Sequence, residues 1–164
     1  PDAQYTNIAE SATVKATNAA DGSDASALND GLLSITTYHD FIPEYLTKKG
    51  TTKITLTFDD YRAIRAIMVF NSKYLETAFG SIDRIELDYK LTDEKGAEQT
   101  GTAYMEDVLF DMEKYTTQWE DEENFARPGG SVTVEFDELM VKEIRITIKA
   151  KNPVAVSEIF VLGK

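Results

Sequence analysis

Strict alternation of apolar and polar residues runs through Ile144-Arg145-Ile146-Thr147-Ile148-Lys149, near the end of the chain. Because successive side chains of a β-strand point to opposite faces, this pattern predicts a strand with one buried and one exposed face. The same period of two recurs in residues 53–58 and 131–136, and in residues 82–89 with one slip. A denser apolar run over residues 64–70 is typical of a strand covered on both faces.

Residues that favour turns separate these predicted strands. They are Asp59-Asp60 and residues 93–96, 128–130 and 151–153. Two further stretches, residues 23–28 and 105–115, suggest helices, but both are too short to carry an architecture. Short strands with frequent turns predict an all-β fold, a jelly-roll β-sandwich.

Length, charge and composition narrow the possible functions. The 164 residues suit a single domain spanning 1–164. A formal net charge of -12 disfavours nucleic acid as a partner, and no apolar run is long enough for membrane insertion. The absence of cysteine excludes disulfides, thiolate zinc sites and a cysteine nucleophile. Acidic residues are concentrated between 106 and 123, which we interpret as a solvated loop, with a cation-attracting patch as the alternative.

Several segments, taken in order, resemble discoidin-like domains, the coagulation-factor C-type fold that includes the family 32 carbohydrate-binding modules. Residues 7–17 resemble the opening strand of that fold, and Ala27-Leu28-Asn29-Asp30-Gly31 resembles its Asp-Gly turn. Residues 141–146 and 156–163 resemble its last two strands, including a Ser-Glu-Ile motif. The resemblance implies a galactose-binding-domain-like jelly roll whose termini lie close together. It does not extend to residues 97–130.

The resemblance also implies a structural calcium ion beneath the Asp-Gly turn. The matching residues are Asp30, Thr36 or Thr37 (Thr37 being preferred), and Glu158. Such an oxygen-only set suits a hard cation. The hydroxyl arrives one residue later than in relatives, and Tyr38 follows it where a Trp is usual. The alternative is that Asp30 closes an Asx-type turn and Glu158 pairs with a cationic side chain.

A sugar-binding site needs an aromatic ring for stacking and polar groups for the hydroxyls. The resemblance places Tyr38, His39, Asn71 and Tyr74 at the ligand-binding loop end, with Asn71 at the position of a usual Arg. His39 could equally be an ordinary surface histidine. Trp119 could be a second stacking platform or an anchor that pins its own long loop.

These features favour a non-catalytic carbohydrate-binding module, cut from a larger multidomain protein, that targets an attached enzyme to glycan. The resemblance implies a bacterial, extracellular or cell-surface setting, with a glycoside hydrolase as the parent chain. As an isolated domain the chain is expected to be monomeric. An enzyme would have to use His39-Asp40 or a pair of carboxylates, and neither carries a sequence motif. A structural accessory or protein-adhesion domain is the remaining alternative, and a spacer of that kind should expose an apolar face.

Overall fold

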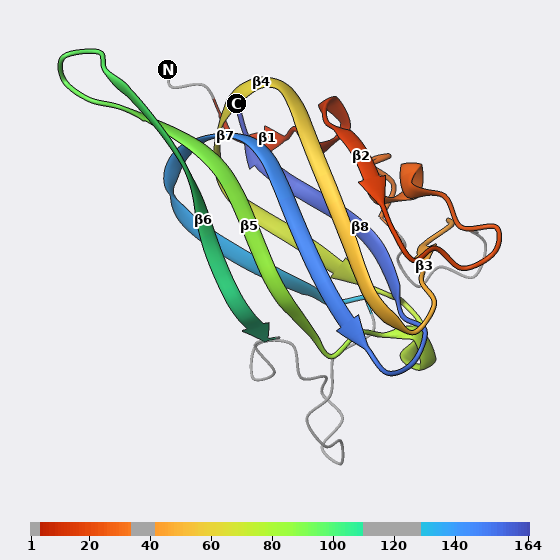
Figure 1. The fold of residues 1–164 in the computed structure, drawn as a ribbon. Helices are drawn as coiled ribbons and strands as arrows, with labels where there is room; N and C mark the ends of the chain where they lie inside the picture. Colours follow the sequence, from red (N-terminus) through yellow and green to blue (C-terminus); the bar gives the residue numbers. More distant parts are fainter. Residues whose placement is uncertain (1–3, 34–41, 110–128) are drawn as a thin grey trace, which may run out of the picture.

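A computed structural model of the chain describes residues 4–33, 42–109 and 129–164 (Figure 1). These residues form β-strands joined by short loops and three turns of 3₁₀ helix. The strands are β1 (Thr6–Asn7), β2 (Thr13–Ala16), β3 (Tyr45–Leu46), β4 (Gly50–Asn71), β5 (Ser81–Thr92), β6 (Glu98–Leu109), β7 (Ser131–Ala150) and β8 (Ala155–Gly163). The 3₁₀ helices are η1 (Ala9–Ser11), η2 (Ala25–Leu28) and η3 (Leu75–Thr77).

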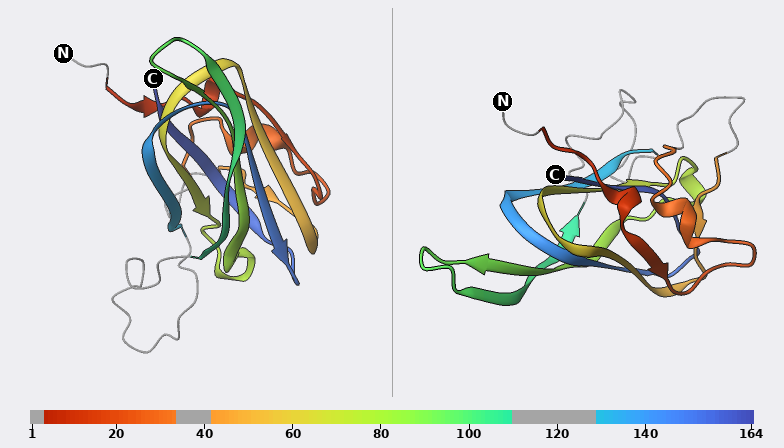
Figure 2. Two further views of the ribbon diagram at one scale, coloured as in Figure 1. Left: turned by 60° about the vertical axis from the view of Figure 1, so that its left-hand side comes forward. Right: turned by 90° about the horizontal axis from the view of Figure 1, so that it is seen from above.

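Two long strands, β4 and β7, run through both layers of a β-sandwich. In the first layer, residues 50–57 of β4 lie between β2 and the end of β7, and β5 and β6 follow. In the second layer, the remainder of β4 lies between β8 and the start of β7. The hydrogen-bonded order β1-β8-β4-β7-β5-β6 therefore curls over, so that its two halves face each other (Figure 2).

The apolar side chains of the alternating segments fill the space between the layers, as predicted. Ile54, Leu56 and Phe58 on β4 and the three isoleucines of residues 144–148 on β7 are at most 1% exposed. Their polar neighbours face outward. The dense run in the second half of β4 is buried less completely than predicted, because Met68 and Phe70 on its other face are half-buried. The all-β sandwich predicted from the sequence is confirmed.

Two local predictions are wrong. Asp59-Asp60 does not end a strand, because it lies inside β4 where the pairing with β7 shifts register between Thr57 and Arg62. Such an irregularity accommodates turn-forming residues and bends the strand, while both flanks stay paired with β7. Met105–Leu109, predicted as the start of a helix, forms the end of strand β6 and pairs with β5. The rest of that predicted helix lies outside the described residues.

The two ends of the chain lie side by side, as the resemblance implied. Thr6 of β1 lies opposite Gly163 of β8 in an antiparallel pair. At the start of β8, Val156 lies opposite both Tyr45 of β3 and Asn71 of β4, so the loops at these strand ends are close together. Asn71 and Tyr74 of the predicted ligand site fall here. Within the described residues, we find no helix of sufficient length and apolar character to cross a membrane.

Candidate functional site

Asn71, the last residue of β4, holds the loop that follows it. Its side chain is fully buried, and its Oδ1 accepts hydrogen bonds from the backbone N–H groups of Ser72 (2.9 Å) and Phe79 (2.8 Å). Its Nδ2 donates to the Phe79 carbonyl at 3.0 Å. The amide therefore ties both ends of the loop 72–79 together. Sequence reasoning placed Asn71 in contact with the sugar, but its burial and its hydrogen bonds make it a positioning residue instead.

Glu44 connects this loop to the segment that precedes β3. Its carboxylate accepts hydrogen bonds from the Ser72 hydroxyl (2.8 Å) and from the Lys73 backbone N–H (2.9 Å). The Ser72 hydroxyl also lies 2.7 Å from the Thr77 hydroxyl and accepts from the Tyr74 backbone N–H at 3.1 Å. Nothing in the residue pattern around Glu44 indicated this role, because the contact joins segments 28 residues apart.

Tyr74 stands exposed above a shallow hollow. The hollow has a volume of about 190 Å³, and its described lining residues are Ile42, Pro43, Glu44, Leu46, Tyr74, Thr77 and Ala155. The side chain of Tyr74 is 46% exposed, and the Lys73 ammonium lies 5.1 Å from the centre of its ring. An aromatic ring beside a mostly apolar hollow with polar groups at its edge is the arrangement that stacks on a sugar ring.

The predicted contacts fall partly outside the described residues. Tyr38, His39 and Trp119 lie there, and so do Thr36 and Thr37 of the predicted calcium site. Tyr74 is the predicted sugar contact that the structure places at the surface of the loop end.

The Asp-Gly turn packs against β8 through Glu158. Glu158 is fully buried, and its Oε2 accepts a hydrogen bond from the Gly31 backbone N–H at 2.7 Å. Its other oxygen, Oε1, has no hydrogen-bond partner among the described residues. Asp30 Oδ1 accepts from the Leu32 backbone N–H at 2.9 Å, which is the Asx-type turn of the alternative interpretation. The carboxyl of Glu10 lies over Gly31, where its Oε1 would clash with an added Cβ.

Burial dominates the electrostatics of Glu158. Removal from water, together with smaller contributions from the neighbouring carboxyls of Asp30 and Glu10, raises the pKa of its carboxyl to about 9. The Gly31 hydrogen bond acts in the opposite direction. A buried, incompletely bonded carboxyl among other acids favours either a proton or a cation. Across the described residues, no three side chains of His, Asp or Glu converge as a complete metal-ligand set.

No protein-family profile and no curated protein matches this sequence. Solved structures do match over nearly the whole chain. A fucose-binding module from Streptococcus pneumoniae has 12% identity and a TM-score of 0.60, with 98% of this chain and 96% of that chain covered. The family 32 carbohydrate-binding module of C. perfringens NanJ, in complex with galactose, has 19% identity and a TM-score of 0.55, with 96% and 98% covered.

A third match is to part of a larger protein. A Ruminococcus gnavus GH29 fucosidase in complex with fucose has 15% identity and a TM-score of 0.53, with 96% of this chain but 26% of that chain covered. At identities this low, the likeness establishes the fold. The chain has the discoidin-like, galactose-binding-domain-like β-sandwich fold that the sequence motifs implied.

Proposed function

We propose that this chain is a non-catalytic carbohydrate-binding module whose ligand site is the loop end that carries Tyr74. The observation that carries the proposal is the exposed Tyr74 ring beside the hollow, held by the Glu44 and Asn71 hydrogen bonds. A loop fixed in this way presents its aromatic ring without a large loss of entropy on binding. The structures of the same fold that bind fucose and galactose support this assignment.

The structural-spacer hypothesis is less well supported. It predicts an apolar face left open for a neighbouring domain. Among the described residues, the exposed large apolar side chains are divided between loops, at Leu32, Tyr74 and Leu75, and the β5–β6 hairpin, at Leu91 and Tyr104. This distribution favours a module with an aromatic loop site over one with a docking face.

We also propose a structural calcium ion at the Asp-Gly turn. Asp30, Glu158 and Thr37 would hold it together with backbone carbonyls of the turn. The unpartnered oxygen of Glu158 and the nearby Asp30 carboxyl fit a hard cation, which prefers carboxylate and carbonyl oxygens. The ion would neutralise buried acidic groups and fix the turn.

The wider setting is a further part of this proposal. The module would be extracellular or on a bacterial cell surface and would hold an attached enzyme, such as a glycoside hydrolase, near glycan. The match to part of a fucosidase supports this setting, because that structure contains a region of the same fold within a longer chain.

Substitution of Tyr74 by Ala should weaken binding of a neutral sugar about tenfold, because loss of an aromatic contact removes up to about 1.5 kcal/mol. A glycan-array screen of the chain, with and without calcium, would identify the sugar. Titration calorimetry or an NMR titration would then compare the Kd values of the variants. His39→Ala and Trp119→Ala, in the same assay, test the two predicted contacts outside the described residues.

The matched control for Tyr74 is Tyr104→Ala, which removes a comparably exposed ring from the β5–β6 hairpin. It should leave the Kd unchanged. Equal losses in both variants, or no neutral glycan bound by the wild-type chain, would contradict the assignment of the loop end.

A further inference from the structure

Lysines form a diagonal row on the outward face of the first layer. Lys15 on β2 lies opposite Thr55 on β4, two residues from Lys53. Lys53 in turn lies opposite Thr147 on β7, two residues from Lys149. Residues opposite each other in an antiparallel pair share a face, as do residues two apart on one strand. The three side chains, here called the lysine row, therefore cross three adjacent strands at diagonal spacings of about 7–8 Å.

The charges of this row are largely available to a ligand. All three lysines are exposed, and neither Lys15 nor Lys53 forms an ion pair with any described residue. Lys149 lies 3.5 Å from Asp83, and its side chain is 62% exposed, so this pair is weak and open to water.

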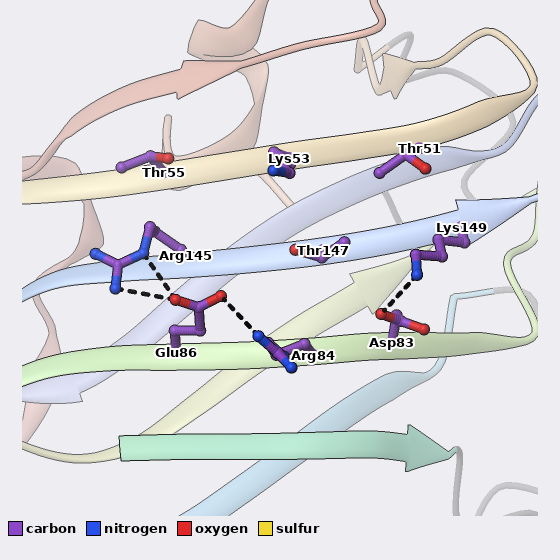
Figure 3. A pocket seen from close by; sticks show the side chains of 9 residues that line it. All are labelled: Thr51, Lys53, Thr55, Asp83, Arg84, Glu86, Arg145, Thr147 and Lys149. Atoms are coloured by element: carbon purple, nitrogen blue, oxygen red, sulfur yellow. Dashed lines mark hydrogen bonds and ion pairs between the residues drawn. The ribbon is translucent and has the colours of Figure 1, made fainter. Parts of the chain in front are cut away.

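A hollow of about 560 Å³ lies beside the row on the same face (Figure 3). Its described lining includes Lys53, Lys149 and the threonines Thr51, Thr55 and Thr147. Thr147 on β7 is short and lies between the long side chains of Lys53 on β4 and Arg84 on β5. The surface of β7 is therefore accessible to a ligand at this position. No side-chain hydrogen bond to another described residue engages these three threonines, so their hydroxyls are available as donors.

On the opposite wall of the hollow, the two arginines are already engaged by carboxylates. Arg145 donates to Glu86 at 3.0 Å and to Asp88 at 2.6 Å, and it also pairs with Glu143. Arg84 pairs with Glu106 on β6. A negatively charged ligand is thus attracted to the β2–β4 side of the hollow, where Lys15, Lys53 and the threonine hydroxyls have no partner in the described part of the chain. It is kept from the carboxylates of the β5 side.

We propose that the lysine row and its threonines form a second binding site, for an acidic polysaccharide that carries carboxylate or sulfate groups. Ammonium groups at regular intervals match a polymer with repeated negative charge, and the threonine hydroxyls donate to its anionic and hydroxyl oxygens. The chain as a whole has a net charge of -12, so attraction must come from close contacts. At physiological ionic strength the Debye length is about 8 Å, so salt largely screens the charges of acidic residues that lie further away.

The test uses affinity gel electrophoresis of the wild-type chain in gels that contain polygalacturonate, chondroitin sulfate or neutral dextran. A variant with Lys15→Gln, Lys53→Gln and Lys149→Gln should have an apparent Kd for the acidic polymer about tenfold weaker, since each exposed charge contributes about two- to threefold. The control variant carries Lys48→Gln, Lys95→Gln and Lys151→Gln, three exposed loop lysines, and has the same net charge. It should bind like the wild-type chain. Binding should weaken as NaCl is raised.

The possible outcomes separate this proposal from the loop site. Tyr74→Ala should leave the acidic-polymer affinity unchanged, while the lysine-row variant should keep its affinity for a neutral sugar. Retardation by polygalacturonate alone or chondroitin sulfate alone would identify carboxylate or sulfate as the group recognised. Absence of retardation, equal losses in both lysine variants, or equal retardation by neutral dextran or a DNA duplex would overturn the proposal.

Discussion

Substitution of Asn71 by Leu should lower the free energy of unfolding by about 3 kcal/mol, because three buried hydrogen bonds worth about 0.5–1.5 kcal/mol each are lost. Leu has nearly the same size but cannot hydrogen-bond, so the variant loses the bonds of Asn71 to the Ser72 N–H, the Phe79 N–H and the Phe79 carbonyl. Urea denaturation followed by tryptophan fluorescence and circular dichroism would measure the change. The variant should also lose sugar affinity, since the loop that carries Tyr74 is no longer fixed.

The control is Asn152→Leu, which makes the same chemical change at an exposed position between β7 and β8. It should change the free energy of unfolding by less than about 0.5 kcal/mol. A cost at Asn71 no larger than at Asn152 would show that the amide does not hold the loop. Unchanged stability with lost binding would instead return Asn71 to the role of a direct sugar contact.

The core was predictable because a single pattern determined it. Alternation in residues 53–58 and 144–149 identifies which side chains face inward, whatever strands they pair with, and these residues form the centre of the core. The resemblance of the two ends of the chain to one fold predicted that the termini lie close together, and the pairing of β1 with β8 agrees with this. Both inferences depend on patterns within short segments, and a single sequence is more informative about such patterns than about contacts between distant segments.

The bend of the long strands was not predictable in the same way. Asp59-Asp60 has the composition of a turn, and only the pairing of both flanks with β7 shows that the strand continues through a shift of register. Similarly, residues 105–109 lack clear alternation and gain their strand geometry from pairing with β5. Tertiary contacts outweighed local preference at both places.

The candidate site shows that a residue's role in a family cannot be assigned to this chain from matching sequence position alone. The resemblance placed Asn71 where a ligand-binding Arg is expected, yet Asn71 is fully buried and its side chain holds the loop. Position along a strand does not reveal whether a short amide reaches the surface. Glu44 was missed because its partners come from another segment of the chain. Asp30 shows the opposite case, since an Asp before a Gly carries its own local signal for an Asx-type turn.

Glu158→Gln should stabilise the chain at pH 7 in the presence of a chelator by about 3 kcal/mol, because the shift in the Glu158 pKa is worth about 1.4 kcal/mol per pH unit. The folded state raises this pKa from 4.5 to about 9. Between these values the folded carboxyl keeps its proton while the unfolded carboxyl has lost it. The free energy of unfolding of the wild-type chain therefore falls as pH rises from about 4.5 towards 9, and this contribution is absent in the Gln variant. Urea denaturation of both chains at pH 5, 7 and 9 would measure the difference, in which the other titrating groups cancel.

In the presence of calcium, the wild-type chain should become the more stable of the two. If Glu158 is a ligand, millimolar calcium should raise the Tm of the wild-type chain at pH 7 and leave that of Glu158→Gln nearly unchanged, because the amide lacks the charge that holds the ion. Glu94→Gln, at an exposed turn between β5 and β6, is the control and should behave like the wild-type chain throughout. If the free energy of unfolding has the same pH dependence in the wild-type chain and in Glu158→Gln, burial does not raise the pKa of the Glu158 carboxyl. A wild-type chain with the expected pH profile but no response to calcium would show that a proton, and not a cation, neutralises Glu158.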